Sequence, residues 1–121
     1  MTVLPSTVDR SAPGYGEAYE NSLRQLAALA AELAKARAGG GPKYVERHRS
    51  RGKLLARERI ELLLDRDSAF LELSPLAAWG SDYTVGASLV SGIGVVSGVE
   101  CVITANDPTV RGGAMNPYSL R

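Results

Sequence analysis

Residues 89–105 read LVSGIGVVSGVECVITA, two apolar runs rich in Val and Ile that are separated by Ser97-Gly98. β-Branched runs joined by a two-residue Ser-Gly connection are typical of a β-hairpin, so we predict strands over 89–96 and 99–105. The second run is almost entirely apolar after Glu100, which is typical of a strand covered on both faces. This stretch therefore predicts a hairpin that enters a buried sheet. The sixteen residues that follow can hardly supply its cover, so we expect apolar sheet surface around Val102 and Ile103 to be exposed in this chain.

The residues before position 42 predict a leader and one long helix. Residues 1–16 are rich in Pro, Gly and short polar side chains, which indicates a flexible leader. From 17 to 37 the apolar side chains recur every three or four residues, as on one face of a helix, and Gly39-Gly40-Gly41 ends it. We expect this helix to dock on the rest of the protein or on a partner subunit.

Two shorter helices and one short strand are predicted between the long helix and the hairpin. Pro42 suits the first position of a helix that ends at Gly52, and the apolar side chains of 54–65 line one side of another. A turn at 65–68 then leads to a short strand over 70–73. The predicted class is mixed, α+β or α/β. The predicted parts are a leader (1–16), a helical segment (17–64) and the start of a sheet-bearing domain (65–121).

Charge is segregated along the chain, although the formal net charge is only +1. Residues 43–59 carry seven basic and two acidic side chains, between a neutral segment and an acidic one. This basic block predicts a phosphate or an acidic surface as its partner, but a solvated helix surface or a grip on nucleic acid would look similar. Only Tyr44 is interleaved as an aromatic and the pI is about 7.9, which disfavours nucleic acid.

Few residues carry recognisable chemistry. Cys101 is the only cysteine, so no disulfide forms within the chain, and a reducing compartment such as the cytoplasm fits best. No apolar run approaches the roughly 20 residues of a membrane span, and the N-terminus does not resemble a signal peptide. His48 is the only histidine and has no nearby partners for a metal site or a triad, so we predict a surface or packing role.

The last residues raise the question of whether a helix is cut off. Asn116 and Pro117 predict a helix start, because one supplies a capping oxygen and the other a ring suited to the first helical position. Only four residues follow, whereas a helix needs about 12 to stand alone. We therefore expect the chain to be the opening part of a longer protein. Gly112-Gly113 predicts either a loop that an oxyanion approaches closely or a plain loop before this helix.

Two long stretches together resemble one family. GGGPKYVERHRSRGKLLARERIELLLDRDSAFLELS (39–74) and GIGVVSGVECVITANDPTVRGGAMNP (92–117) are similar to the opening of biotin-dependent acyl-CoA carboxylase β subunits, the carboxyltransferase component. Within them, FLELS and ANDPTVRGGA look closer to methylcrotonyl-CoA carboxylase than to propionyl-CoA carboxylase. The resemblance implies two crotonase-like domains, each a spiral of β-β-α units, of which this chain would hold an incomplete first part.

The same resemblance implies a reaction and its participants. A carboxyl group would pass from carboxybiotin, carried on a biotin carboxylase and carrier α subunit, to an acyl-CoA, within an oligomer of β subunits. It implies no metal in this chain and neither a nucleic-acid nor a membrane partner. In the family, paired backbone amides downstream of this chain hold the reacting oxygens. We therefore assign no catalytic residue and expect the chain alone to be inactive.

The resemblance also implies an acyl-CoA binding site. The Arg-Gly-Lys-Leu-x-Ala-Arg motif makes Arg51, Lys53 and Arg57 candidates for the CoA phosphates, with Arg111, Gly112 and Gly113 as a substrate-side loop. The chain departs from the family pattern at Leu55, where Thr or Pro often stands, and this predicts poorer capping of the next helix. A small basic module of helices and strands that binds nucleic acid or an acidic protein is the alternative from a different class.

Overall fold

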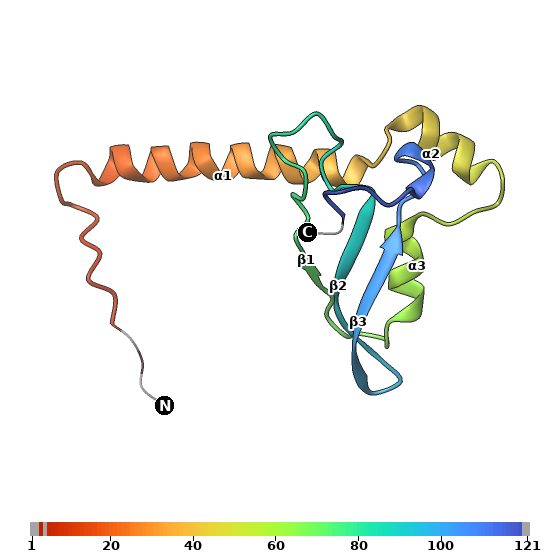
Figure 1. The fold of residues 1–121 in the computed structure, drawn as a ribbon. Coiled ribbons are helices and arrows are strands. Elements are labelled where there is room, and N and C mark those ends of the chain that lie inside the picture. Colours follow the sequence, from red (N-terminus) through yellow and green to blue (C-terminus); the bar gives the residue numbers. More distant parts are fainter. Residues whose placement is uncertain (1–2, 4, 120–121) are drawn as a thin grey trace. The chain divides into compact units, whose positions relative to one another are not determined.

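The computed structural model describes residues 3 and 5–119 and contains the expected helices followed by strands (Figure 1). The chain divides into two compact units, one up to Ala31 and one from Glu32 onward. The boundary falls within the first helix. The elements are α1 (Tyr15–Ala38), α2 (Pro42–Arg49), α3 (Ala56–Leu63), β1 (Leu71–Leu73), β2 (Leu89–Val96), β3 (Val99–Asn106) and a 3₁₀ turn (Arg111–Gly113).

The first unit holds the leader and the first two-thirds of α1. The helix begins at Tyr15, two residues before the predicted start, and the rings of Tyr15 and Tyr19 stack with centroids 6.1 Å apart. Tyr19, Leu23 and Leu26 are exposed along this helix. The docking of its apolar face therefore stays a prediction.

The second unit is built on a three-stranded antiparallel sheet in the order β1-β2-β3. The hairpin predicted around Ser97-Gly98 is confirmed, with Val96 opposite Val99 and Gly92 opposite Ile103. Both turn residues have positive φ, 51° at Ser97 and 77° at Gly98, as the tight turns of hairpins require. The Asp65 carboxylate accepts hydrogen bonds from both turn amides, at 2.6 Å from Ser97 N and 2.7 Å from Gly98 N.

One face of the sheet packs against α3 (Figure 1). Ala56 and Ile60 of the helix form the buried core with Val90 and Ile103 of the hairpin. Phe70, predicted as the first strand residue, instead precedes β1, and its ring lies so close to Gly92 that a Cβ there would overlap it. The absence of a side chain at this position thus lets the aromatic ring close the core.

In the part of the chain described, β3 is covered on one face only, so the expected exposure of apolar sheet surface is found at Val102 but not at Ile103. Ile103 is 8% exposed because it points toward α3, whereas its neighbour Val102 is 75% exposed. Alternate side chains of a strand point to opposite faces, and α3 covers only one of them. Leu71, Ile93 and Val102 form a row across the uncovered face.

The helix predicted after Asn116 is a turn over residues 116–119, and residues 120–121 lie outside the described part. Asn116 Oδ1 accepts hydrogen bonds from Tyr118 N at 3.0 Å and Ser119 N at 3.1 Å, as a helix cap would. Its Nδ2 donates to Ala87 O at 2.8 Å and lies 3.2 Å from Ser88 Oγ. Ala87 and Ser88 are buried with positive φ, so Asn116 satisfies polar atoms of a strained corner before β2.

Candidate anion-binding groove

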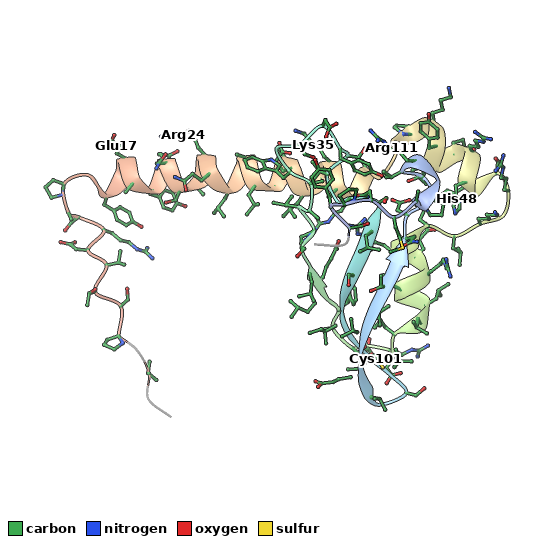
Figure 2. The ribbon with its side chains drawn as sticks, viewed as in Figure 1. Glu17, Arg24, Lys35, His48, Cys101 and Arg111 are labelled. Atoms are coloured by element: carbon green, nitrogen blue, oxygen red, sulfur yellow. The ribbon has the colours of Figure 1, made fainter. Side chains whose placement is uncertain are left out.

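The basic helix α2 and the loop after β3 border two adjoining hollows in the second unit, of about 410 Å³ and about 600 Å³. They share four lining residues, so we treat them as one site, the basic groove. Figure 2 shows His48 and Arg111 on this side of the unit, with Cys101 near the hairpin turn. The groove is lined chiefly by Tyr44, Arg47, His48, Arg51, Lys53, Arg59, Pro108, Arg111 and Gly112.

The loop after β3 is held by the glycines that end α1. Thr109 is buried, and its Oγ1 donates to Asp107 Oδ1 at 2.6 Å and accepts a hydrogen bond from Gly40 N at 3.0 Å. A Cβ on Gly40 would overlap the Thr109 carbonyl, so only glycine permits this approach. Gly-Gly-Gly at 39–41 and Asp-Pro-Thr at 107–109, two motifs that carried the resemblance, are therefore in contact.

The groove concentrates positive charge that no carboxylate of residues 3 and 5–119 neutralises. The salt bridges of the described residues use Lys35, Arg49 and Arg57 as their cations. Arg47, Arg51, Lys53 and Arg59 line the groove without an acidic partner in that part of the chain. Unpaired guanidinium and ammonium groups that converge on a hollow suit a multiply charged anion such as phosphate.

His48 shapes the groove through a hydrogen bond and has no metal-site partners. Its Nε2 lies 3.1 Å from the Leu54 carbonyl oxygen, and because a carbonyl only accepts, Nε2 carries the proton. This bond ties α2 to the chain that leads into α3. Along residues 3 and 5–119, no three His, Cys, Asp or Glu side chains are grouped so that they could hold a metal ion. None of the helices described there is long and apolar enough to cross a membrane.

Leu55 occupies the N-cap position of α3. Leucine has no side-chain acceptor for the first backbone amides of α3, so the poorer capping predicted from the sequence is found there. The Glu58 carboxylate nevertheless accepts a hydrogen bond from Leu55 N at 2.7 Å and one from Arg49 at 2.5 Å. One reciprocal half of a capping box is thus present, and it also links α3 to α2.

The structure brings together most of the predicted site residues. Arg51, Lys53, Arg111 and Gly112 all line the groove, and Gly113 is buried in the same loop. Arg57 does not reach the groove.

Arg57 instead links three elements of the second unit. Its guanidinium forms an ion pair with Glu72 of β1 at 2.5 Å, and Nη1 lies 3.4 Å from the carbonyl oxygen of Ala36 in α1. These contacts engage the donors that the motif had suggested for a phosphate. The sequence alone could not separate Arg57 from Arg51, because the distinction depends on an acidic partner 15 residues away.

Several lining residues were missed from the sequence. Tyr44, Arg47, His48 and Arg51 follow each other at helical spacing, so an inspection of one helical face would have found the first two. Thr84 also lines the groove, and the Arg111 guanidinium lies 4.3 Å from the ring centroid of the adjacent Tyr83. No sequence signal marks Tyr83 or Thr84, because they come from an irregular segment between β1 and β2.

Comparison with known proteins shows the family of the chain. Residues 47–121, more than half of the chain, match the family model described as "Carboxyl transferase domain". The chain therefore belongs to the carboxyl transferase family. The mixed fold predicted from the sequence, the start of a crotonase-like domain, is also confirmed.

Individual relatives are more specific. The chain is 63% identical over 119 residues to a probable biotin-dependent acyl-coenzyme A carboxylase beta2 subunit of Mycobacterium tuberculosis, covering 98% of this chain and 22% of that protein. It is 45% identical over 126 residues to the probable mitochondrial methylcrotonoyl-CoA carboxylase beta chain of Drosophila melanogaster, with coverages of 98% and 21%. The chain spans about a fifth of the length of these relatives.

Solved structures show the same likeness. The β subunit of Pseudomonas aeruginosa geranyl-CoA carboxylase matches with a TM-score of 0.64 at 30% identity, covering 98% of this chain and 23% of that one. The transcarboxylase 12S structure with hydrolysed methylmalonyl-coenzyme A matches with a TM-score of 0.61 at 32% identity, over 74% of this chain and 18% of its own. The family prediction from the sequence is therefore confirmed.

Proposed function

We propose that this chain is part of the carboxyltransferase component of a biotin-dependent acyl-CoA carboxylase and that its basic groove binds the phosphates of the acyl-CoA. The observation that carries the proposal is a group of four cations around the basic groove that have no acidic partner among the described residues, namely Arg47, Arg51, Lys53 and Arg59. Of the parts of an acyl-CoA, only its phosphates carry the charge that such a lining would bind. Gly112 adds a stretch of backbone that a phosphate can approach without meeting a side chain.

We assign the phosphate contacts to cations that form no salt bridge with another described residue. Arg51, Lys53 and Arg111 would contact phosphate oxygens directly. Arg57, engaged by Glu72, would instead hold α3 against the sheet and leave binding to the others. In this assignment the described residues bind substrate, and the carbon–carbon bond would form elsewhere in the complete protein.

The binding of the carboxyl donor and the choice of acyl group are proposed for the complete protein. Carboxybiotin, which supplies the carboxyl group, would arrive on a partner subunit that carries biotin. We assign none of the described residues to it and place the phosphates of the acyl-CoA, which carry several negative charges, in the basic groove. The methylcrotonoyl-CoA carboxylase beta chain among the relatives supports a methylcrotonyl-like substrate.

The assembly and location form part of the same proposal. Other copies of the subunit would complete an oligomer, residues 65–121 would open the first crotonase-like domain, and the protein would act in the cytoplasm. The free thiol of Cys101 is consistent with a reducing compartment.

Steady-state kinetics of the full-length protein with its biotin-carrying subunit test the groove. We expect Arg51→Ala combined with Lys53→Ala to raise KM for 3-methylcrotonyl-CoA at least tenfold, since a hydrogen bond to a charged group contributes about 1.5 kcal/mol or more. The value of kcat should stay within about twofold, because ground state and transition state share these contacts.

Arg66→Ala is the matched control, since Arg66 is an exposed arginine outside the groove. Its KM should equal that of the unmodified protein. An unchanged KM in the double variant would contradict the proposed site. If the double variant instead lost a strongly salt-dependent binding of duplex DNA, the alternative of a nucleic-acid-binding module would be favoured.

A further inference from the structure

Arg111 differs from the other cations of the groove because an aromatic ring supports it. Its guanidinium carbon lies 4.3 Å from the centroid of the Tyr83 ring, well within the range of a cation–π contact. The contact joins the loop after β3 to the irregular segment between β1 and β2. Thr84, the residue after Tyr83, lines the groove together with Arg111, so the contact lies at the edge of the groove.

A stacked guanidinium keeps its hydrogen-bonding capacity. The contact with Tyr83 uses the face of the planar group, whereas its five N–H donors point outward in the plane. No salt bridge of the described residues involves Arg111. Stacking therefore restricts where the guanidinium lies and leaves its donors available for an anion.

The backbone of Arg111 is held in an unusual conformation. Its φ is 45°, a left-handed value that non-glycine residues rarely adopt and that costs about 1 kcal/mol or more. Gly112 follows with a φ of 74°, so the loop turns sharply directly after the arginine. The surroundings must stabilise this conformation, and the stacking partner is one contact that does so.

Tyr83 is itself supported from the end of the described chain. Its ring packs against that of Tyr118, with centroids 6.0 Å apart at an angle of 43°. Tyr118 N donates to Asn116 Oδ1, and Asn116 Nδ2 donates to the Ala87 carbonyl oxygen. A continuous set of contacts thus runs from the corner before β2 through two aromatic rings to Arg111.

We propose that Tyr83 is a positioning residue that holds the Arg111 guanidinium at the groove, so that its N–H edge meets a phosphate of the acyl-CoA. The inference rests on the proposed function, since it gives Arg111 a phosphate to bind. It goes further by assigning a role to a tyrosine that no motif marks. Tyr83 would not touch the substrate and would act only through Arg111.

A double-mutant cycle in the full-length protein tests this role, with the dissociation constant for CoA measured by isothermal titration calorimetry. We expect Arg111→Ala to weaken CoA binding about tenfold or more. Tyr83→Leu should weaken it about threefold to fivefold. Tyr83→Phe, which keeps the ring, should stay within about twofold, and Tyr83→Leu should add no further loss in the Arg111→Ala background.

The double-mutant cycle distinguishes a tyrosine that positions Arg111 from one that only stabilises the fold. A purely structural tyrosine would give an equal loss with and without Arg111, and this result would overturn the inference, as would a Tyr83→Phe variant as weak as Tyr83→Leu. If Tyr83→Leu does not fold, Tyr83→Met takes its place in the cycle.

The proposed function and the positioning role can fail separately. If Arg111→Ala leaves CoA binding unchanged while Arg51→Ala and Lys53→Ala weaken it, the groove binds CoA but the role of Tyr83 is refuted. If all three leave it unchanged, the proposed phosphate site is refuted together with the positioning role.

Discussion

Replacing Asp65 with Asn tests what holds the β2–β3 hairpin in register. The Asp65 carboxylate accepts hydrogen bonds from both amides of the hairpin turn, and Asp65 N donates to the Val95 carbonyl oxygen at 2.9 Å. The side chain of Asn has the same shape but only one acceptor oxygen, so its NH₂ group would face a backbone N–H. The substitution therefore removes one hydrogen bond and the negative charge without changing the volume.

The expected loss of stability follows from the two hydrogen bonds to the Asp65 carboxylate and from their exposure to solvent. A hydrogen bond to a charged group contributes about 1.5–3 kcal/mol when it is shielded, and this turn is exposed, so we take about 1–2 kcal/mol for the substitution. Because about 1.4 kcal/mol corresponds to a factor of ten, local opening of the turn should become about 5 to 30 times more frequent. The core formed with α3 should be less affected, since hairpin ends open independently of buried segments.

Hydrogen exchange measured by mass spectrometry on the full-length protein is the suitable assay, because it reports local opening within a large protein. Peptides that contain Ser97 and Gly98 should exchange faster by the factor above, and those from α1 should not change. Asp67→Asn is the control, since Asp67 lies two residues away with a positive φ that Asn tolerates. Equal exchange in the two variants would refute the role assigned to the Asp65 carboxylate.

Three further predictions concern other supports of the fold and the groove. Ser97→Gly should stabilise the hairpin by about 0.5–1 kcal/mol, seen as slower exchange of the same turn peptides, because Ser97 has a φ of 51°. Gly40→Ala should lower the melting temperature and weaken CoA binding, since its Cβ would overlap the Thr109 carbonyl; Gly16→Ala, with open space around it, should do neither. Glu72→Gln should cost about 1 kcal/mol or less in thermal stability and leave KM for the acyl-CoA unchanged, and a raised KM would argue that Arg57 has a direct role in binding.

The local elements of the fold were predictable because short-range chemistry determines them. The Ser-Gly connection between two Val- and Ile-rich runs located both long strands to within one residue at their ends. Pro42 and the glycines before it located the start of α2. The charge of the groove was predictable for the same reason, since seven cations within 43–59 exceed the two carboxylates available to pair with them.

The errors share a different cause, because each depended on a partner distant in the sequence. An apolar strand does not show by itself which of its faces a helix covers, so the burial of Ile103 beside the exposed Val102 could not be read from their own segment. Arg57 and Arg51 belong to one motif, yet Glu72 engages only the first. Local patterns thus indicated where charged and apolar side chains gather. Tertiary contacts decided which charges are paired and which apolar side chains are buried.

The loop that carries Arg111 illustrates this division most clearly, because its supports all come from elsewhere in the chain. Gly40, 69 residues before Thr109, binds the hydroxyl of that threonine, and Tyr83 stacks on Arg111. Asn116 resembles a simple helix cap in the sequence, but its amide group also fastens the buried corner at Ala87. A substitution at any of these three positions would move the same guanidinium, although none of them carries a charge. The affinity of the groove for an anion should therefore be sensitive to uncharged residues that a search for basic motifs would pass over.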